Sequence, residues 1–152
     1  MNKREFLKNA AALSSLAILP AESWAFSANK RLRTAHIGLG GMGQADLESI
    51  SLHSHVDVVA LCDVDSNVLA EVSAKFPKAK TYKDYRVMLK EMSKDIDAVI
   101  VSTPDHTHAP ASMMAMEMNK PVYCQKPLTH YVKEARAMDK IAKDKKLVTQ
   151  MG

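Results

Sequence analysis

The stretch Thr34–Gly43 reads T-A-H-I-G-L-G-G-M-G and sets Gly38, Gly40 and Gly43 in G-x-G-x-x-G spacing after a short apolar run. This order predicts a buried strand that turns into a helix. Gly38 is expected to permit the tight turn, Gly40 to let a pyrophosphate approach, and Gly43 to let the helix pack on the strand. The helix N-terminus would offer N–H groups and a partial positive charge to the phosphates. By itself the pattern is weak, and a plain glycine-rich turn is the alternative.

A second apolar run, Val56–Cys62, follows the expected helix and leads directly into Asp63. Asp63 stands 20 residues after Gly43, which is about where a dinucleotide site places the acid that binds the adenosine ribose. An NADP phosphate would meet this carboxylate as a like charge, and no arginine follows closely enough in sequence to hold it. The sequence therefore predicts NAD as the cofactor.

Strand and helix patterns alternate along the rest of the chain without internal repeats. Further strands are expected at Lys80–Tyr82, Ile96–Val101, Pro121–Cys124 and Leu147–Met151. Further helices are expected from Ser66 as N-cap through Phe76, at Asp84–Met92, at Met113–Met118 with Pro110 in the first turn, and from Thr129 as N-cap through Lys143. This alternation favours an α/β fold with a doubly wound parallel sheet and right-handed crossovers, the Rossmann fold.

The composition suits one globular domain. The chain has 152 residues, of which 47% are hydrophobic, and a formal net charge of +4. The basic residues are scattered and aromatic residues make up only 5%, so a solvated surface explains the charge better than nucleic-acid binding. We therefore expect no nucleic-acid partner.

The first residues predict export. A basic start precedes the apolar stretch Ala10–Leu19, which is too short to span a bilayer. Residues 1–25 are expected to be a signal peptide cleaved after Ala25, and residues 26–31 a linker to the domain at 32–152. The start resembles a twin-arginine signal with Lys3 at the position of the first arginine, which implies a periplasmic protein. An amphipathic helix of the domain itself is the alternative.

Two polar segments follow expected strands, Ser102–His108 and Gln125–Pro127. In such a sheet, ligands lie beyond the carboxyl ends of the strands. His108 is expected to line the cofactor crevice and His106 to be exposed. A metal site formed by these histidines and Asp105 is a weak alternative because no Cys or Glu partner is near, so we expect no metal.

Three further side chains lie within expected strands. His36 is expected to be a core residue with its hydrogen bonds satisfied. Cys62 and Cys124 would end strands separated by two others, so three strand spacings place them roughly 14 Å apart. A disulfide allows only about 7 Å between Cα atoms, and two free, buried thiols are expected.

Taken together, the glycine turn, Asp63, the segment T-P-D-H-T-H at 103–108 and Lys126-Pro127 resemble the Gfo/Idh/MocA oxidoreductases, in this order and over residues 32–152. That family includes glucose-fructose oxidoreductase and inositol dehydrogenase, and uses NAD(P) on sugars, polyols and their derivatives. The cofactor contacts that the resemblance implies are Gly38, Leu39, Gly40, Gly41, Met42, Gly43, Asp63, Thr103, Pro104, Asp105, His108, Gln125 and Lys126.

The resemblance also implies that Lys126 is catalytic and meets both the substrate hydroxyl and the nicotinamide ribose. A surface lysine is the alternative. The family normally has Glu before this lysine, whereas Gln125 accepts hydrogen bonds, adds donors and lacks the charge. We expect a cis bond between Lys126 and Pro127, which would turn the lysine into the crevice.

Family members place an α+β substrate domain after the sixth strand, so this chain is expected to be the cofactor domain of a longer, homo-oligomeric enzyme. Three functions stay open at this point. The first is an NAD-dependent oxidoreductase that transfers a hydride to or from a sugar, polyol or related carbohydrate. The second is a glycosidase that retains NAD and oxidises the sugar transiently, and the third is a non-catalytic dinucleotide-binding module.

Overall fold

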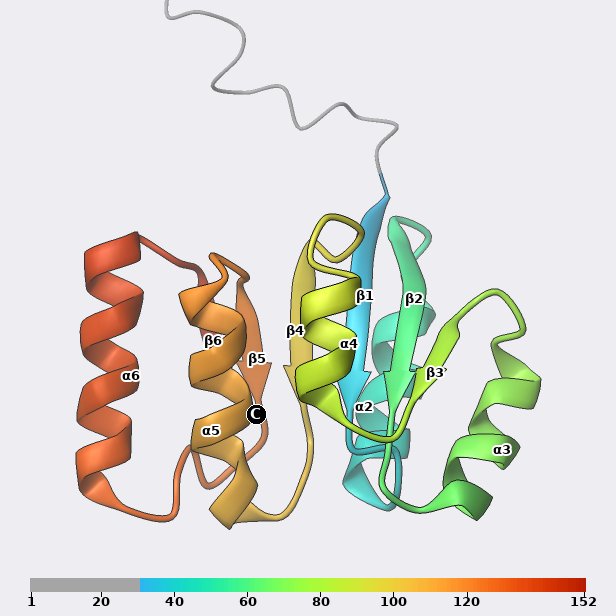
Figure 1. Cartoon of the computed structure of the whole chain (residues 1–152), viewed down its shortest axis with the longest axis horizontal. Helices are drawn as coiled ribbons and strands as arrows, with labels where there is room; N and C mark the ends of the chain where they lie inside the picture. The colour runs from blue at the N-terminus through green and yellow to red at the C-terminus, as the bar shows by residue number, and fades with distance from the viewer. Residues whose placement is uncertain (1–30) are drawn as a thin grey trace, which may run out of the picture. The chain divides into compact units, whose positions relative to one another are not determined.

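The computed structural model describes residues 31–152, and the expected signal peptide lies outside the described residues. Six parallel strands form one sheet in the order β3-β2-β1-β4-β5-β6 (Figure 1). The strands are β1 (Leu32–Ile37), β2 (Val56–Cys62), β3 (Lys80–Tyr82), β4 (Ala98–Val101), β5 (Val122–Cys124) and β6 (Thr149–Met151). The helices are α2 (Met42–Ser51), α3 (Ser66–Lys75), α4 (Tyr85–Glu91), α5 (Asp105–Glu117) and α6 (Val132–Lys145). No helix within these residues is long and apolar enough to cross a membrane.

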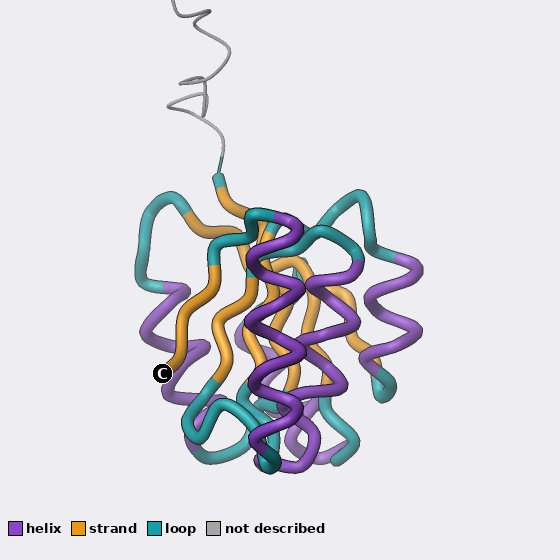
Figure 2. Tube along the Cα trace, turned by 90° about the vertical axis from the view of Figure 1, so that its left-hand side faces the viewer, coloured by secondary structure: helices purple, strands orange, loops and turns teal. Residues whose placement is uncertain are grey.

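Helices cover both faces of the sheet, and Figure 2 shows the strands between them. One apolar cluster joins Ala35 and Ile37 of β1 to α4, α5 and α6, while another joins Leu61 of β2 to α2 and α3. Side chains of a strand alternate between its faces, so a central strand under two helical layers is buried throughout. Residues 34–37 of β1 are all buried. The predicted Rossmann fold is confirmed.

The start of α5 differs from the prediction. The helix begins at Asp105, so Pro110 is its sixth residue and lies inside it rather than in the first turn. Proline lacks the N–H that would bond the carbonyl four residues earlier, which is why the sequence favoured a later start. The first turns are held instead by tertiary contacts, because both ring nitrogens of His108 lie within 2.7 Å of carbonyl oxygens on neighbouring loops.

Two helix caps also differ. Asp65, and not Ser66, is the N-cap of α3, and its carboxylate accepts a hydrogen bond from the Asn67 N–H at 2.8 Å. Tyr131, and not Thr129, is the N-cap of α6. The Thr129 hydroxyl donates to the Tyr131 carbonyl at 2.9 Å and so shapes the loop before the helix. A side chain oxygen near a helix start can serve either role, since serine, threonine and aspartate all bond nearby backbone groups.

Arg31, expected to end the linker, contacts the sheet. Its guanidinium donates to the Val56 carbonyl at 2.6 Å and pairs with Asp57 at 2.8 Å. Arg31 is thus part of the compact unit Arg31–Gly152.

Cys62 and Cys124 are free and buried, as predicted. They end β2 and β5, which are separated by β1 and β4. Burial, with smaller contributions from Asp63 and Asp84, raises the pKa of Cys62 to about 12. Burial also raises the pKa of Cys124, so both thiols stay protonated at neutral pH.

Candidate cofactor-binding site

A cavity of about 510 Å³ opens at the carboxyl ends of β1, β2 and β4. The chain order reverses between β1 and β4, and a doubly wound sheet binds its ligand at this switch point. The cavity is large enough for part of a dinucleotide. Its lining consists of Ile37, Gly38, Gly40, Cys62, Asp63, Val64, Lys83, Tyr85, Ser102, Thr103, Pro104, His106, Thr107 and Ala111.

Glycine is found at the three positions of the turn for different structural reasons. Gly38 has φ +84°, and a Cβ there would lie 2.6 Å from the Ser102 carbonyl oxygen. A Cβ on Gly43 would strike the Gly38 carbonyl oxygen. No described atom lies within 4 Å of a Cβ placed on Gly40. The fold thus requires the first and third glycines, whereas the space beside Gly40 lies on the cavity side and stays open to a ligand.

The start of α2 fits an anion. Gly41 is the N-cap, no side chain among residues 31–152 caps this helix, and its first turn holds no acid. The first N–H groups of a helix lack intrahelical acceptors and carry partial positive charge. These residues therefore fit a pyrophosphate, with Met42 exposed at the helix start.

Asp63 is held in place by backbone groups on two sides. Its Oδ2 accepts from the Leu39 N–H at 2.7 Å, and its Oδ1 accepts from the Asp65 N–H at 2.9 Å. Each carboxylate oxygen can accept more than one hydrogen bond, so the ribose hydroxyls still find acceptors. The buried Leu39 thus takes part through its backbone, by fixing the carboxylate against the glycine turn.

Lys83 and Tyr85 line the cavity although the sequence analysis did not select them. Lys83 lies in the loop after β3 and Tyr85 begins α4, and β3 pairs with β2 in parallel. The carboxyl end of β3 must therefore reach the same edge of the sheet as Asp63. The expected strand Lys80–Tyr82 carried this signal, because residues that follow any strand of the sheet are candidates for the site.

Gln125 lies buried next to the turn, at the end of β5. It is 7% exposed, and its Nε2 donates to Asp46 Oδ1 at 3.1 Å. Its Oε1 accepts from the Lys126 N–H at 2.9 Å. The bond between Lys126 and Pro127 is cis, as predicted.

Comparison with known proteins agrees with this geometry. The family model described as "Oxidoreductase family, NAD-binding Rossmann fold" matches residues 32–152. The chain belongs to the Gfo/Idh/MocA oxidoreductase family. It is the NAD-binding Rossmann domain of that family, and the predicted family and cofactor class are confirmed.

Curated relatives include both dehydrogenases and hydrolases. The chain is 30% identical over 124 residues to inositol 2-dehydrogenase of Salmonella paratyphi B, which covers 80% of the chain and 36% of that protein. It is 32% identical over 136 residues to a glycosyl hydrolase family 109 protein of Stenotrophomonas maltophilia, which covers 82% of the chain and 29% of that protein. The chain thus spans about a third of the length of these relatives.

Solved structures give the same fold. The myo-inositol 2-dehydrogenase of Lactobacillus plantarum superposes with a TM-score of 0.75 at 31% identity, covering 81% of this chain and 36% of that one. GenD2 from gentamicin A biosynthesis, in complex with NAD, superposes with a TM-score of 0.75 at 26% identity, covering 81% of this chain and 34% of that one.

Lys126, the expected catalytic residue of this family member, does not line the cavity. It is exposed at the same edge of the sheet, after β5. The placement of Lys126 against the substrate and the nicotinamide ribose stays a prediction.

His108 is not among the residues that line this cavity, whereas His106 is exposed, as expected, and is one of the lining residues. His108 is 1% exposed, with Nδ1 2.7 Å from the Pro127 carbonyl oxygen and Nε2 2.6 Å from the Thr103 carbonyl oxygen. Both histidines lie within α5, where two residues differ by about 200° around the axis. His106 consequently lines the cavity, and His108 joins the loops after β4 and β5.

Asp105 contacts a residue that the sequence analysis missed. Its carboxylate lies 3.1 Å from Nδ1 of His130, in the loop before α6, and 3.8 Å from Nδ1 of His106. The hydrogen bond with His130 is the main cause that lowers the pKa of Asp105. Within residues 31–152, no group of three or more His, Cys, Asp or Glu side chains could hold a metal ion.

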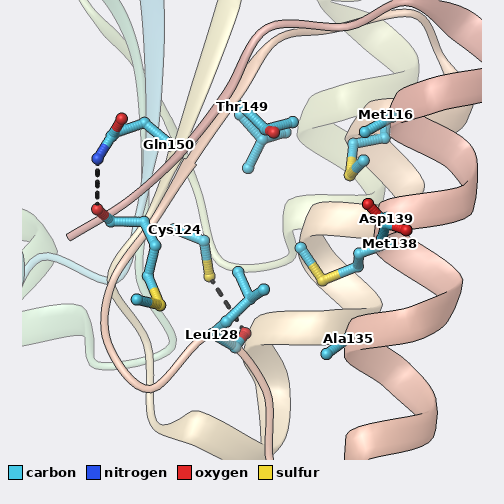
Figure 3. Close-up of a pocket in the computed structure, with 11 residues that line it drawn as sticks. Met116, Cys124, Leu128, Ala135, Met138, Asp139, Thr149 and Gln150 are labelled. Carbon is cyan, nitrogen blue, oxygen red and sulfur yellow. Dashed lines mark hydrogen bonds between the residues drawn. The ribbon is translucent and has the colours of Figure 1, made fainter.

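A second cavity, of about 200 Å³, lies between α6 and the strands β5 and β6 (Figure 3). Its lining is mainly apolar and includes Leu128, Met138 and Cys124, whose thiol donates to the Leu128 carbonyl. None of the predicted site residues lines it. The cavity at the glycine turn is therefore the better candidate for the dinucleotide.

Proposed function

We propose that this chain is the cofactor-binding part of an oxidoreductase that transfers a hydride between NAD and a carbon of a sugar, polyol or related carbohydrate. One observation carries the proposal: the open space beside Gly40 adjoins the uncapped start of α2 and the anchored carboxylate of Asp63. The similarity to inositol 2-dehydrogenases supports the substrate class.

In the proposed reaction, the residues of this chain would have different functions. The start of α2 binds the pyrophosphate, and Asp63 binds the adenosine ribose through its free lone pairs. Thr103, Pro104 and His106 also line the cavity. Bound NAD supplies the hydride acceptor or donor. Lys126, exposed at this edge, would bind the substrate hydroxyl and hold its proton as the hydroxyl is oxidised.

Cofactor choice tests the proposal. NADP brings a phosphate toward Asp63, and at about 4 Å with an effective dielectric near 20 each unit of like charge costs roughly 4 kcal/mol before screening. We expect calorimetric titration to give at least tenfold tighter binding of NAD than of NADP. Asp63→Asn should reduce this preference, because it removes the charge and keeps one acceptor.

Asp65→Asn is the matched control, since it removes the same charge two residues on and asparagine is an equally good N-cap. Wild-type protein that binds NADP as tightly as NAD would contradict the assignment. So would an Asp63→Asn variant with an unchanged preference.

A glycosidase that retains NAD is a second candidate, favoured by the similarity to family 109 glycosyl hydrolases. Net redox change separates the two. The protein that contains this chain, incubated with carbohydrate and NAD, should accumulate NADH if it is a dehydrogenase. A glycosidase would release sugar over many turnovers without accumulated NADH. Under a third proposal, a non-catalytic binding module, Lys126→Ala would change nothing beyond binding.

We also propose that residues 1–25 direct export to the periplasm and that the whole enzyme is a homo-oligomer. The basic start, the apolar stretch Ala10–Leu19 and the small residues before Phe26 support export. Sequencing of the protein recovered from the periplasm should give an N-terminus at or near Phe26. Intact Met1 on cytoplasmic protein would contradict it. Sedimentation of the whole enzyme tests the oligomer.

A further inference from the structure

A buried carboxylate connects three elements behind the glycine turn. Asp46 is the fifth residue of α2 and is 8% exposed. Its Oδ2 accepts from the Ser102 hydroxyl at 2.6 Å, at the end of β4. Its Oδ1 accepts from Gln125 Nε2 at 3.1 Å, at the end of β5. The carboxylate therefore fixes the ends of two strands relative to the helix that begins at the glycine turn.

The Gln125 amide transmits this contact to the next residue. Its nitrogen donates to Asp46 and its oxygen accepts from the Lys126 N–H at 2.9 Å. With the amide turned over, its oxygen would face the carboxylate, and its NH₂ group would face the Lys126 N–H. Both contacts would then be lost. Asp46 thus selects the one orientation in which Gln125 can hold the backbone of Lys126.

The same geometry explains the glutamine at position 125. A glutamate there would place two carboxylates in contact, and one would have to take up a proton or move away. Asp46 therefore requires an uncharged donor at position 125. The negative charge that the family places before the lysine is supplied in this chain by Asp46, from α2. Asp46 also affects a residue of β5. The pKa of Tyr123 is raised first by burial and second by the negative charge of Asp46.

We propose that Asp46 is a positioning residue that acts through the Gln125 amide to hold Lys126 at the substrate edge of the cofactor site. Asp46 and Gln125 form a matched pair of carboxylate and amide, in which neither residue can be exchanged alone. The consequence for catalysis rests on the proposed function of Lys126. The hydrogen-bonded connection itself can be measured without any ligand.

Amide hydrogen exchange in the 152-residue chain, followed by NMR without dinucleotide, tests the connection. Asp46→Ala frees the Gln125 amide, so the Lys126 N–H should exchange about tenfold faster. The Val99 N–H, which bonds the Pro121 carbonyl within the sheet, reports general loosening and should change much less. Glu48→Gln is the matched control, because it removes an exposed carboxylate from the same helix and should leave Lys126 unchanged.

A swap of the pair separates positioning from a merely structural role. Gln125→Glu alone should speed the exchange of Lys126 about tenfold or more, since it faces Asp46 with a like charge. Adding Asp46→Asn restores one carboxylate and one amide in exchanged positions. The double variant should bring the Lys126 rate back to within about threefold of wild type.

The proposal is overturned if the double variant exchanges as fast as Gln125→Glu alone, or if Asp46→Ala speeds Lys126 no more than Val99. The comparison of Gln125→Glu with the double variant stands even if Asp46→Ala does not fold. Titration of the same samples with NAD tests the proposed function separately. If the double variant restores the slow exchange of the Lys126 N–H but does not bind NAD, the proposed function is contradicted and the positioning role of Asp46 stands.

Discussion

Gly40→Ala separates cofactor binding from folding at the glycine turn. The Cβ would meet no described atom within 4 Å, and Gly40 is not among the glycines with positive φ. The free energy of unfolding should therefore change by less than about 1 kcal/mol, and a small gain is expected because alanine restricts the unfolded chain. The same methyl group occupies the space through which a pyrophosphate would reach the start of α2.

The expected loss of affinity follows from the hydrogen bonds at risk. A bond from a backbone N–H to a charged acceptor contributes about 1.5–3 kcal/mol. Losing one such bond weakens NAD binding about 10- to 100-fold.

Gly38→Ala is the contrasting variant. Its φ of +84° and the 2.6 Å approach to the Ser102 carbonyl oxygen add strain of about 1–2 kcal/mol and overpacking of about 1–3 kcal/mol. It should lower the free energy of unfolding by about 2–5 kcal/mol, a large share of the 5–15 kcal/mol typical of a domain.

Urea unfolding and calorimetric titration with NAD measure the two quantities on the same preparations. We expect Gly40→Ala to unfold at the wild-type urea concentration and to bind NAD weakly. Gly38→Ala should unfold at a clearly lower concentration. A Gly40→Ala variant that binds NAD like the wild type would refute the assignment of the pyrophosphate to this turn. A loss of stability as large as that of Gly38→Ala would refute the claim that the space is free.

Three further predictions concern stability and reactivity. Burial lowers the pKa of His36 from 6.5 to about 4. Between these pH values the unfolded chain binds a proton at His36 and the folded chain does not, so the free energy of unfolding should fall by on the order of 3 kcal/mol as the pH drops from 6.5 to 4. His36→Gln should flatten this dependence in urea unfolding measured from pH 4 to 7.5. Asp65→Ala removes the bond to the Asn67 N–H and should cost about 1 kcal/mol in the same assay. Cys62 and Cys124 should react with a thiol reagent only after denaturation, because burial raises the pKa of both thiols; rapid reaction of the folded protein would contradict this.

Features governed by local sequence were predictable. The strand β3 was found at its expected bounds, and α4 lies within one residue of its expected range at each end. Asp84 before α4 is a capping residue, with its carboxylate bonded to the Arg86 N–H. Such signals depend on neighbours in the chain, and the apolar spacing and the turn glycines carry them without tertiary context.

Features governed by tertiary contacts were not predictable. The early turns of α5 contain polar residues and precede Pro110, so their helical state depends on the contacts that His108 makes with two loops. His36 was expected to be satisfied, yet its Nδ1 has no partner among the described residues, while Nε2 lies 3.1 Å from Thr34 Oγ1. Nothing in the sequence near His36 indicates how many partners the fold supplies.

The candidate site is held by bonds that exist before any ligand arrives. Asp63 is fixed by the Leu39 N–H, the Gly38 N–H bonds the Cys62 carbonyl, and the Ser102 N–H bonds the Ile37 carbonyl. A site already ordered in the free protein loses less conformational freedom on binding. The partners of each bond come from different strands, so the glycine turn, the acid and the loop after β4 act as one unit. Removal of the Asp63 side chain should consequently loosen the glycine turn as well as weaken ribose binding, whereas Asp63→Asn removes the charge together with only one of the two backbone hydrogen bonds.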